Sequence, residues 1–183
     1  MRDDGLGYSR VIVRTAVVII LALVWGGPLT AGTPEYGVKA AYLYNFLKFT
    51  EWPNNEALTS FTLCVYGKDP FGGFLDETVR GKQASGLPVL VRRLPGGDER
   101  VDGCQILFIS SSERLETVLT MLHGRSILTV GESDGFAARG GMIGLVMDQS
   151  NVRLDINLAA IAAARLQVSS RLILVCRLVG PRK

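Results

Sequence analysis

The chain has 183 residues, and its 20 Lys and Arg against 17 Asp and Glu leave a formal net charge of +3. Both signs are spread along the sequence without a basic block, which argues against a nucleic-acid-binding protein. A single histidine and three widely spaced cysteines form no metal-ligand or Cys-x-x-Cys pattern, so we expect no metal and no cofactor.

Residues 1–32 have the three parts of a secretory signal peptide. Arg10 and Arg14 supply positive charge, the apolar run "AVVIILALVW" (16–25) follows, and small residues end the segment. A membrane-spanning helix needs about 20 apolar residues, more than this run provides, and an uncleaved anchor is the alternative. We therefore predict a cleaved signal peptide, delivery outside the cytoplasm, and one mature domain over residues 33–183. Cleavage removes three basic and two acidic residues and leaves a net charge of +2.

The mature chain is expected to begin with an amphipathic helix over residues 34–50, which Trp52-Pro53 ends because the residue before a proline avoids helical angles. We expect the aromatic members of its apolar stripe in the core. The stripe, at steps of three and four, consists of Val38, Ala41, Tyr42, Asn45, Phe46 and Phe49.

The stretch "YLYNFLKFTEWP" (42–53) contains five aromatic residues. Few lysines flank it, so a helix lying on a membrane is disfavoured. Tyr44, Leu47 and Trp52 fall off the stripe, and exposed aromatic residues often anchor interfaces. We interpret the stretch as mostly core, with a docking edge for another protein as the alternative.

Strands and helices alternate along the rest of the chain, which predicts a single compact α/β domain with a mixed β-sheet flanked by helices. The helix after the third strand has Ser110 and Glu113 in the pattern of a capping box. In chain order we expect a strand at 61–66, a helix from 69 to about 80, a strand at 87–94, a strand at 105–110, a helix at 111–124, a strand at 126–130, a hairpin of 142–147 and 152–156, a helix at 157–166, and an apolar helical segment at 169–179.

Two glycine-rich turns are the segments of the sequence that could bind a ligand. "VYGKDPFGG" (65–73) follows a strand, but it lacks the Lys-Ser/Thr of a phosphate-binding loop, so a capped helix start is favoured over a phosphate- or nucleotide-handling enzyme. "GESDGFAARGG" (131–141) offers Glu132, Phe136 and Arg139, and it is either a binding loop or a series of tight turns.

No enzyme is expected. His123 stands at the end of a predicted helix, where a partial positive charge suits the helix dipole, and no Gly-x-Ser-x-Gly elbow exists. The small residues of the 157–166 helix fit close packing within the domain, and they fit a homodimer seam almost as well.

Several segments occur in an order that resembles the YfiR-like family of exported bacterial proteins, over about residues 37–179. They include "VKAAYLYNFLKFTEWP", "CVYGKDPFGG", "CQILFISSSE" and "SILTVGESDGFAARGGMIGLV". The resemblance implies a periplasmic repressor that binds the periplasmic sensor region of an inner-membrane diguanylate cyclase and so lowers cyclic di-GMP. It also implies that an OmpA-type outer-membrane lipoprotein removes the repressor, and that disulfide state affects folding. A periplasmic small-molecule sensor is the alternative. We predict Trp52, Glu132, Phe136 and Arg139 as partner- or ligand-binding residues.

The three cysteines of an exported protein are expected to form one disulfide and leave one buried thiol. Cys64 and Cys104 match cysteines of the YfiR-like family, and the strands that carry or follow them are expected to be neighbours in the sheet. We therefore predict a Cys64–Cys104 disulfide, with Cys176 free in an apolar segment.

Overall fold

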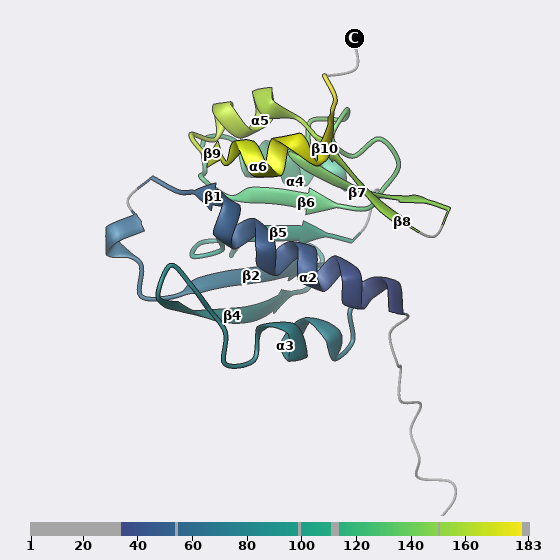
Figure 1. The fold of residues 1–183 in the computed structure, drawn as a ribbon. Coiled ribbons are helices and arrows are strands. Elements are labelled where there is room, and N and C mark those ends of the chain that lie inside the picture. Colours follow the sequence, from purple (N-terminus) through teal and green to yellow (C-terminus); the bar gives the residue numbers. More distant parts are fainter. Residues whose placement is uncertain (1–33, 54, 99, 111–113, 150, 181–183) are drawn as a thin grey trace, which may run out of the picture. The chain divides into compact units, whose positions relative to one another are not determined.

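The computed structural model describes residues 34–53, 55–98, 100–110, 114–149 and 151–180. The predicted signal peptide lies outside the described residues, so the structure does not test it. Figure 1 shows the described part of the chain as one sheet with helices packed on it, which confirms the predicted α/β domain.

An eight-stranded mixed sheet forms the centre of the domain. Its strands are β2 (Phe61–Tyr66), β3 (Gln83–Ala84), β4 (Leu87–Leu94), β5 (Ile106–Ile109), β6 (Leu128–Gly131), β7 (Ile143–Asp148), β8 (Asn151–Ile156) and β10 (Cys176–Leu178).

The strands lie side by side in the order β10-β8-β7-β6-β5-β2-β4-β3. Neighbours from β7 to β4 are parallel, β7 and β8 form the predicted antiparallel hairpin, and β10 adds to β8 in parallel. A separate two-stranded ribbon pairs β1 (Thr50–Glu51) with β9 (Gln167–Val168), and it was not predicted. The central strands β5 and β6 are buried at every residue, as continuous apolar runs predict.

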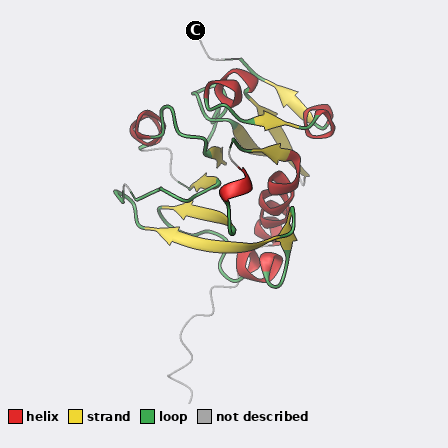
Figure 2. Ribbon diagram, turned by 90° about the vertical axis from the view of Figure 1, so that its left-hand side faces the viewer, coloured by secondary structure: helices red, strands yellow, loops and turns green. Residues whose placement is uncertain are grey.

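Helices cover both faces of this sheet. They are α2 (Pro34–Phe49), α3 (Phe74–Val79), α4 (Leu115–Met121), α5 (Leu158–Ala163) and α6 (Ser170–Leu174), with a 3-10 turn at Asn55–Ala57. Figure 2 turns the sheet so that helices are seen on either side of the strands.

Side chains that alternate along the strands divide the core into two layers. Leu63 and Val65 of β2 point into the layer that α2 covers, while Cys64 and Tyr66 point into the layer that α4 covers. The α2 layer is the larger of the two and contains most of the buried aromatic rings. The α4 layer contains both cysteines of the predicted disulfide.

The predicted apolar stripe of α2 was wrong in part: its aromatic residues Tyr42, Phe46 and Phe49 pack in or against the core, but the centre of the buried face lies about one helix position away. Val38 is 49% exposed and Phe46 is the only stripe residue that is fully buried, whereas Lys39, Ala40, Leu43, Phe46 and Leu47 form the buried face. Lys39 was not part of the predicted stripe. Its ammonium group is paired inside the protein, so this position can be buried and the helix turns a different face to the sheet.

The predicted helix at 169–179 was also wrong in its second half. It ends at Leu174, and residues Cys176–Leu178 form β10. The backbone there gains hydrogen bonds from the edge of β8, because Val179 N donates to the carbonyl oxygen of Ile156 over 2.9 Å. The neighbouring strand that decides this conformation pairs with residues 22 positions away in sequence, which a local pattern cannot show.

Two predicted helix starts lie too early. Helix α3 begins at Phe74, because the carboxylate of Asp69 instead accepts the backbone N–H of Phe71 over 2.7 Å and forms a turn. The hydroxyl of Ser110 donates to the carbonyl of Tyr66 over 3.0 Å. Glu113, the other member of the predicted capping box, lies outside the described residues. Helix α4 begins at Leu115. Among the described residues, no helix combines the length and the apolar character that crossing a membrane requires.

Candidate functional site at the carboxyl edge of the sheet

The carboxyl ends of β2 and β5 form a topological switch point. From β2 the chain first returns on one side of that strand as β4, and then crosses to the other side as β5. Ligands of open α/β sheets bind outside the carboxyl ends of the strands at such a point. The loops that leave β2 and β6 and the first turn of α2 gather at this edge, which makes it the candidate site.

The turn after β2 (residues 67–73) is filled by its own side chains. The ring of Phe71 is fully buried and meets Phe108 edge-on, with 4.8 Å between the ring centroids, and Tyr36 with 5.6 Å. The tight packing of this ring holds the turn against α2 and β5.

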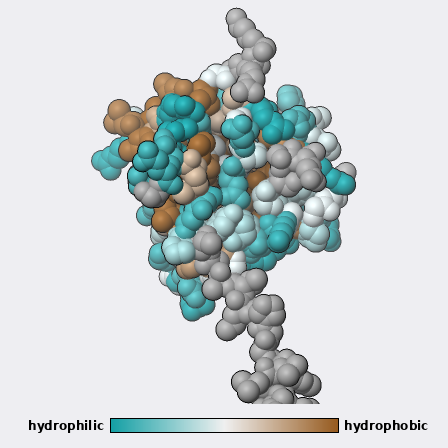
Figure 3. All heavy atoms as spheres, turned by 90° about the vertical axis from the view of Figure 1, so that its right-hand side faces the viewer, coloured by the Kyte–Doolittle hydropathy of each residue, from teal (hydrophilic) through white to brown (hydrophobic). Residues whose placement is uncertain are grey.

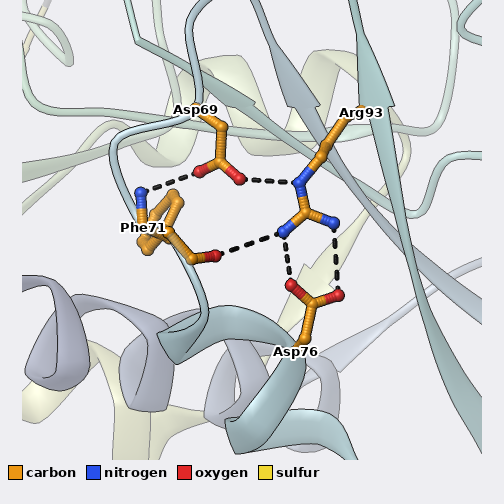
Figure 4. A network of polar contacts seen from close by, with 5 residues as sticks. Asp69, Phe71, Asp76 and Arg93 are labelled. Atoms are coloured by element: carbon orange, nitrogen blue, oxygen red, sulfur yellow. Dashed lines mark hydrogen bonds and ion pairs between the residues drawn. The ribbon is translucent and has the colours of Figure 1, made fainter. Parts of the chain in front are cut away.

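Arg93 of β4 ties the same turn to helix α3 (Figure 4). Its Nε donates to the carboxylate of Asp69 over 2.7 Å, and its terminal nitrogens donate to Asp76. These hydrogen bonds raise the pKa of Arg93, and the one from Arg93 lowers the pKa of Asp76. Two carboxylates beside the turn repel a phosphate group. The capped-start interpretation of this segment was also wrong, because the N-cap residue of α3 is Gly73, which makes no side-chain hydrogen bond, and Asp69 forms a turn before the helix instead.

A cluster around Lys39 joins the first turns of α2 to the loop after β6. Lys39 is 2% exposed, and its ammonium group pairs with the carboxylates of Glu35 and Glu132. The hydroxyl of Tyr36 donates to Glu132 Oε1 over 3.2 Å, and Lys39 Nζ lies 4.7 Å from the centroid of the Tyr36 ring. Burial opposes the charge on Lys39, but the hydrogen bonds to Glu132 and Glu35 outweigh it and raise the pKa of Lys39.

The glycine-rich loop at 131–141 is built around Phe136. Its ring is 1% exposed and lies between Gly131 and Gly141. A Cβ atom on Gly131 would lie 2.3 Å from the ring, and one on Gly141 would lie 2.1 Å from it. The ring therefore requires glycine on both sides, which explains the two glycines without a ligand.

Arg139 leaves the same loop toward the other layer of the domain. Its Nη2 donates to Glu116 Oε1 of α4 over 2.6 Å, and this bond lowers the pKa of Glu116. Glu132 and Arg139, seven positions apart in sequence, thus connect the loop to α2 and to α4. The loop therefore links the two helices through these two ion pairs.

Trp52 lies at the opposite edge of the sheet from Glu132. Its side chain is 7% exposed, its ring packs on Phe61, and its Nε1 donates to the carbonyl of Gln105 over 3.2 Å. Gln105 comes immediately before β5, whereas Glu132 comes immediately after the parallel strand β6. The structure therefore does not bring the four predicted residues onto one surface, and their role in binding stays a prediction.

Comparison with known proteins decides the family. The family described as YfiR/HmsC-like matches residues 36–177, from the first turn of α2 to β10. The chain belongs to this family. No curated protein matches it.

The disulfide predicted from the YfiR-like resemblance is present. Cys64 and Cys104 are bonded, with their Cα atoms 5.8 Å apart, and the bond closes a separation of 40 residues. Arg92 donates to Cys104 Sγ over 3.0 Å and to the carbonyl of Asp102 over 2.6 Å, so this segment is also held to β4. Cys176 is free and half-buried, and burial raises its pKa to about 11.

Sequence reasoning missed the residues that organise this YfiR/HmsC-like site. Tyr36 and Lys39 fell within the predicted helix at 34–50 and Arg93 within the predicted strand at 87–94, and none of them was assigned a role in a site. The spacing of Glu35 and Lys39, four positions apart on one helix face, was the available signal for a paired lysine. Their third partner, Glu132, is 93 positions from Lys39 and carries no local signal.

Replacing Glu132 with glutamine is expected to destabilise the domain by about 1–3 kcal/mol, because a charge-assisted hydrogen bond to a buried lysine is lost. Urea unfolding of the mature protein measures the change. The matched control is Glu116→Gln, which alters an exposed ion pair and should shift the unfolding midpoint little. Equal effects of the two variants would contradict the importance of the Lys39 cluster.

Replacing Trp52 with phenylalanine is expected to cost about 1–2 kcal/mol, because the aromatic ring is kept while its hydrogen bond to Gln105 is lost. Partner binding should stay unchanged, since the side chain is buried. Thermal unfolding and a binding titration on the same variant separate the two effects. Weaker binding at unchanged stability would place Trp52 on a docking surface instead.

Proposed function

We propose that this protein is an exported regulator that represses an inner-membrane diguanylate cyclase by binding the periplasmic sensor region of that enzyme. Repression lowers the cellular level of cyclic di-GMP. Membership of the YfiR/HmsC-like family, over residues 36–177, is the observation that carries this proposal. An OmpA-type outer-membrane lipoprotein is the proposed competitor that removes the repressor.

Features of the domain support a role in binding rather than in catalysis. At the carboxyl edge, where α/β enzymes bind substrates, Phe71 and Phe136 fill the loops with apolar rings. The charged side chains of Arg93 and Lys39 are paired with carboxylates of the same domain. The Cys64–Cys104 disulfide suits an oxidising compartment such as the periplasm.

The test combines a cellular and a biochemical measurement. Deleting the gene is expected to raise cyclic di-GMP, and the wild-type chain supplied in trans should restore the lower level. Purified protein from residue 33 onward should bind the purified periplasmic region of a membrane diguanylate cyclase from the same organism in a calorimetric titration. Unchanged cyclic di-GMP together with no binding would contradict the proposal. Binding of a periplasmic metabolite without any effect on the messenger would favour the small-molecule sensor.

The proposed export predicts where the mature protein begins. The mature protein is expected to begin near Thr33 and to fractionate with the periplasmic contents, because the apolar run at 16–25 is too short to span a bilayer. N-terminal sequencing of the purified protein measures the start. Recovery of the full-length chain in the membrane fraction would show an uncleaved anchor.

A further inference from the structure

The Cys64–Cys104 disulfide has a positive charge against one of its sulfur atoms. Arg92 of β4 pairs in register with Cys64 of β2, so its side chain lies on the same face of the sheet as both cysteines. Its Nη2 donates to Cys104 Sγ over 3.0 Å. Both sulfurs are shielded from water, because Cys64 is 1% exposed and Cys104 is 3% exposed. The charge of the guanidinium therefore acts on Cys104 with little screening by solvent.

This guanidinium contacts no carboxylate among the described residues. Its hydrogen bonds go to Cys104 Sγ and to the carbonyl oxygen of Asp102, and its buried Nε has no acceptor in the described part of the chain. Arg93, the next residue of β4, instead pairs with Asp69 and Asp76. A disulfide sulfur is uncharged and a weak acceptor, so the oxidised bond compensates the charge of Arg92 poorly. A state of the protein that places an anion at this position is therefore favoured.

The other charged groups described around the bond have partners of their own. The carboxylate of Asp102 is 86% exposed and binds Arg125, and Asp98 binds Arg100. The hydrogen bonds from Arg100 hold the pKa of Asp98 below its ordinary value, and the charge of the β4 guanidinium adds to this only as a lesser cause. The hydroxyl of Tyr66 accepts from Gly97 N over 2.8 Å. Helix α4 buries apolar side chains in this layer, namely Leu115, Val118 and Leu122.

We propose that Arg92 is a positioning residue for the redox chemistry of this disulfide, because it holds Cys104 as a thiolate when the bond is reduced and so makes the bond easier to reduce. A dithiol supplies the two electrons, and its two sulfurs leave joined as a disulfide. One of its protons goes to Cys64, which becomes a thiol, and the other goes to solvent. Cys104 Sγ then accepts a charge-assisted hydrogen bond from Arg92, which is stronger than its bond to the neutral disulfide. This role does not depend on the proposed function.

The first test measures the equilibrium of the mature protein with dithiothreitol, with Cys176→Ala in every variant so that only two thiols take part. Arg92→Gln is expected to shift the equilibrium constant about tenfold or more toward the disulfide, which lowers the reduction potential by about 30 mV. Arg92→Lys keeps a positive charge and should recover most of this shift. The matched control is Arg93→Gln, which removes the neighbouring guanidinium and its ion pairs, and it should leave the potential unchanged.

Exposed apolar surface lies on other strands and does not account for a shift of this kind. Leu174 is 84% exposed, Val175 68% and Leu178 61%. Figure 3 shows hydrophobic surface gathered on the side of the molecule that carries α6 and β10. Strands β10 and β4 lie near opposite ends of the strand order, so association at that surface leaves the contacts of Arg92 in place.

A second test identifies the thiolate. The ultraviolet absorbance of the reduced protein is followed over a range of pH, and alkylation with peptide mapping then shows which cysteine ionises first. Cys104 is expected to ionise with a midpoint below about 8.5, the ordinary value of a cysteine thiol, and Arg92→Gln should raise that midpoint. Circular dichroism follows the fold of the reduced protein.

Three results would overturn the proposal. One is a reduction potential that Arg92→Gln leaves unchanged, or that Arg93→Gln shifts equally. Another is a first thiolate at Cys64. The third is reduced wild-type protein that unfolds, because both cysteines would then ionise as ordinary thiols in every variant.

Discussion

Gly141→Ala is expected to destabilise the protein by about 3 kcal/mol or more, at the upper end of the cost of overpacking a core. The new Cβ would lie 2.1 Å from Cε1 of Phe136, whereas separations under 3.0 Å are essentially never seen. The ring has no room to move away, because Gly131 lies against its other edge, where a built Cβ atom would be only 2.3 Å from the ring. The backbone of the loop would have to shift. That shift would disturb the contacts of Glu132 with α2 and of Arg139 with α4. Equilibrium unfolding in urea measures the loss.

Two comparisons isolate the cause of this loss. Gly96→Ala is the control, because a Cβ there meets no atom within 4 Å and the backbone angle is ordinary, so stability should change little. In a Phe136→Leu background, Gly141→Ala should cost less than in wild type, since the smaller side chain removes the clash. Equal costs of Gly141→Ala in the two backgrounds would show that the ring is not responsible.

Reducing the Cys64–Cys104 disulfide is expected to lower the free energy of unfolding by about 4 kcal/mol. The bond closes a loop of 40 residues, and the chain-entropy model gives this value for a loop of that length. For a domain of this size the melting temperature should fall by about 10 °C. Thermal unfolding with and without reductant measures the shift. We expect the proposed repression to weaken in cells that lack disulfide-forming machinery.

The free thiol provides the control for this experiment. Cys176→Ala should keep the stability of wild type and its full response to reductant, because Cys176 takes no part in the bond. A variant with Cys64→Ala and Cys104→Ala should be insensitive to reductant. A full response to reductant in that double variant, or none in wild type, would contradict the assignment of stability to this bond.

The local sequence pattern was sufficient to predict the bounds of two strands of the core. The prediction of a strand at 61–66 coincides with β2, and the prediction at 87–94 coincides with β4. Both segments are short and rich in β-branched or aromatic residues, and turn residues bound them, so no distant part of the chain is needed to define them. The disulfide followed from the strand positions of its cysteines and from the YfiR-like resemblance. The sequence alone thus determined the fold class, the family and the covalent link.

Only the tertiary structure decided which surfaces those elements present. The buried face of α2 depends on Lys39, whose burial requires a carboxylate 93 positions away. The strand at Cys176–Leu178 depends on the open edge of β8, and the glycines at 131 and 141 depend on a ring that folds back between them. In each case the deciding partner is brought near by the completed fold. Local propensities differ by about 1 kcal/mol or less, so such contacts override them.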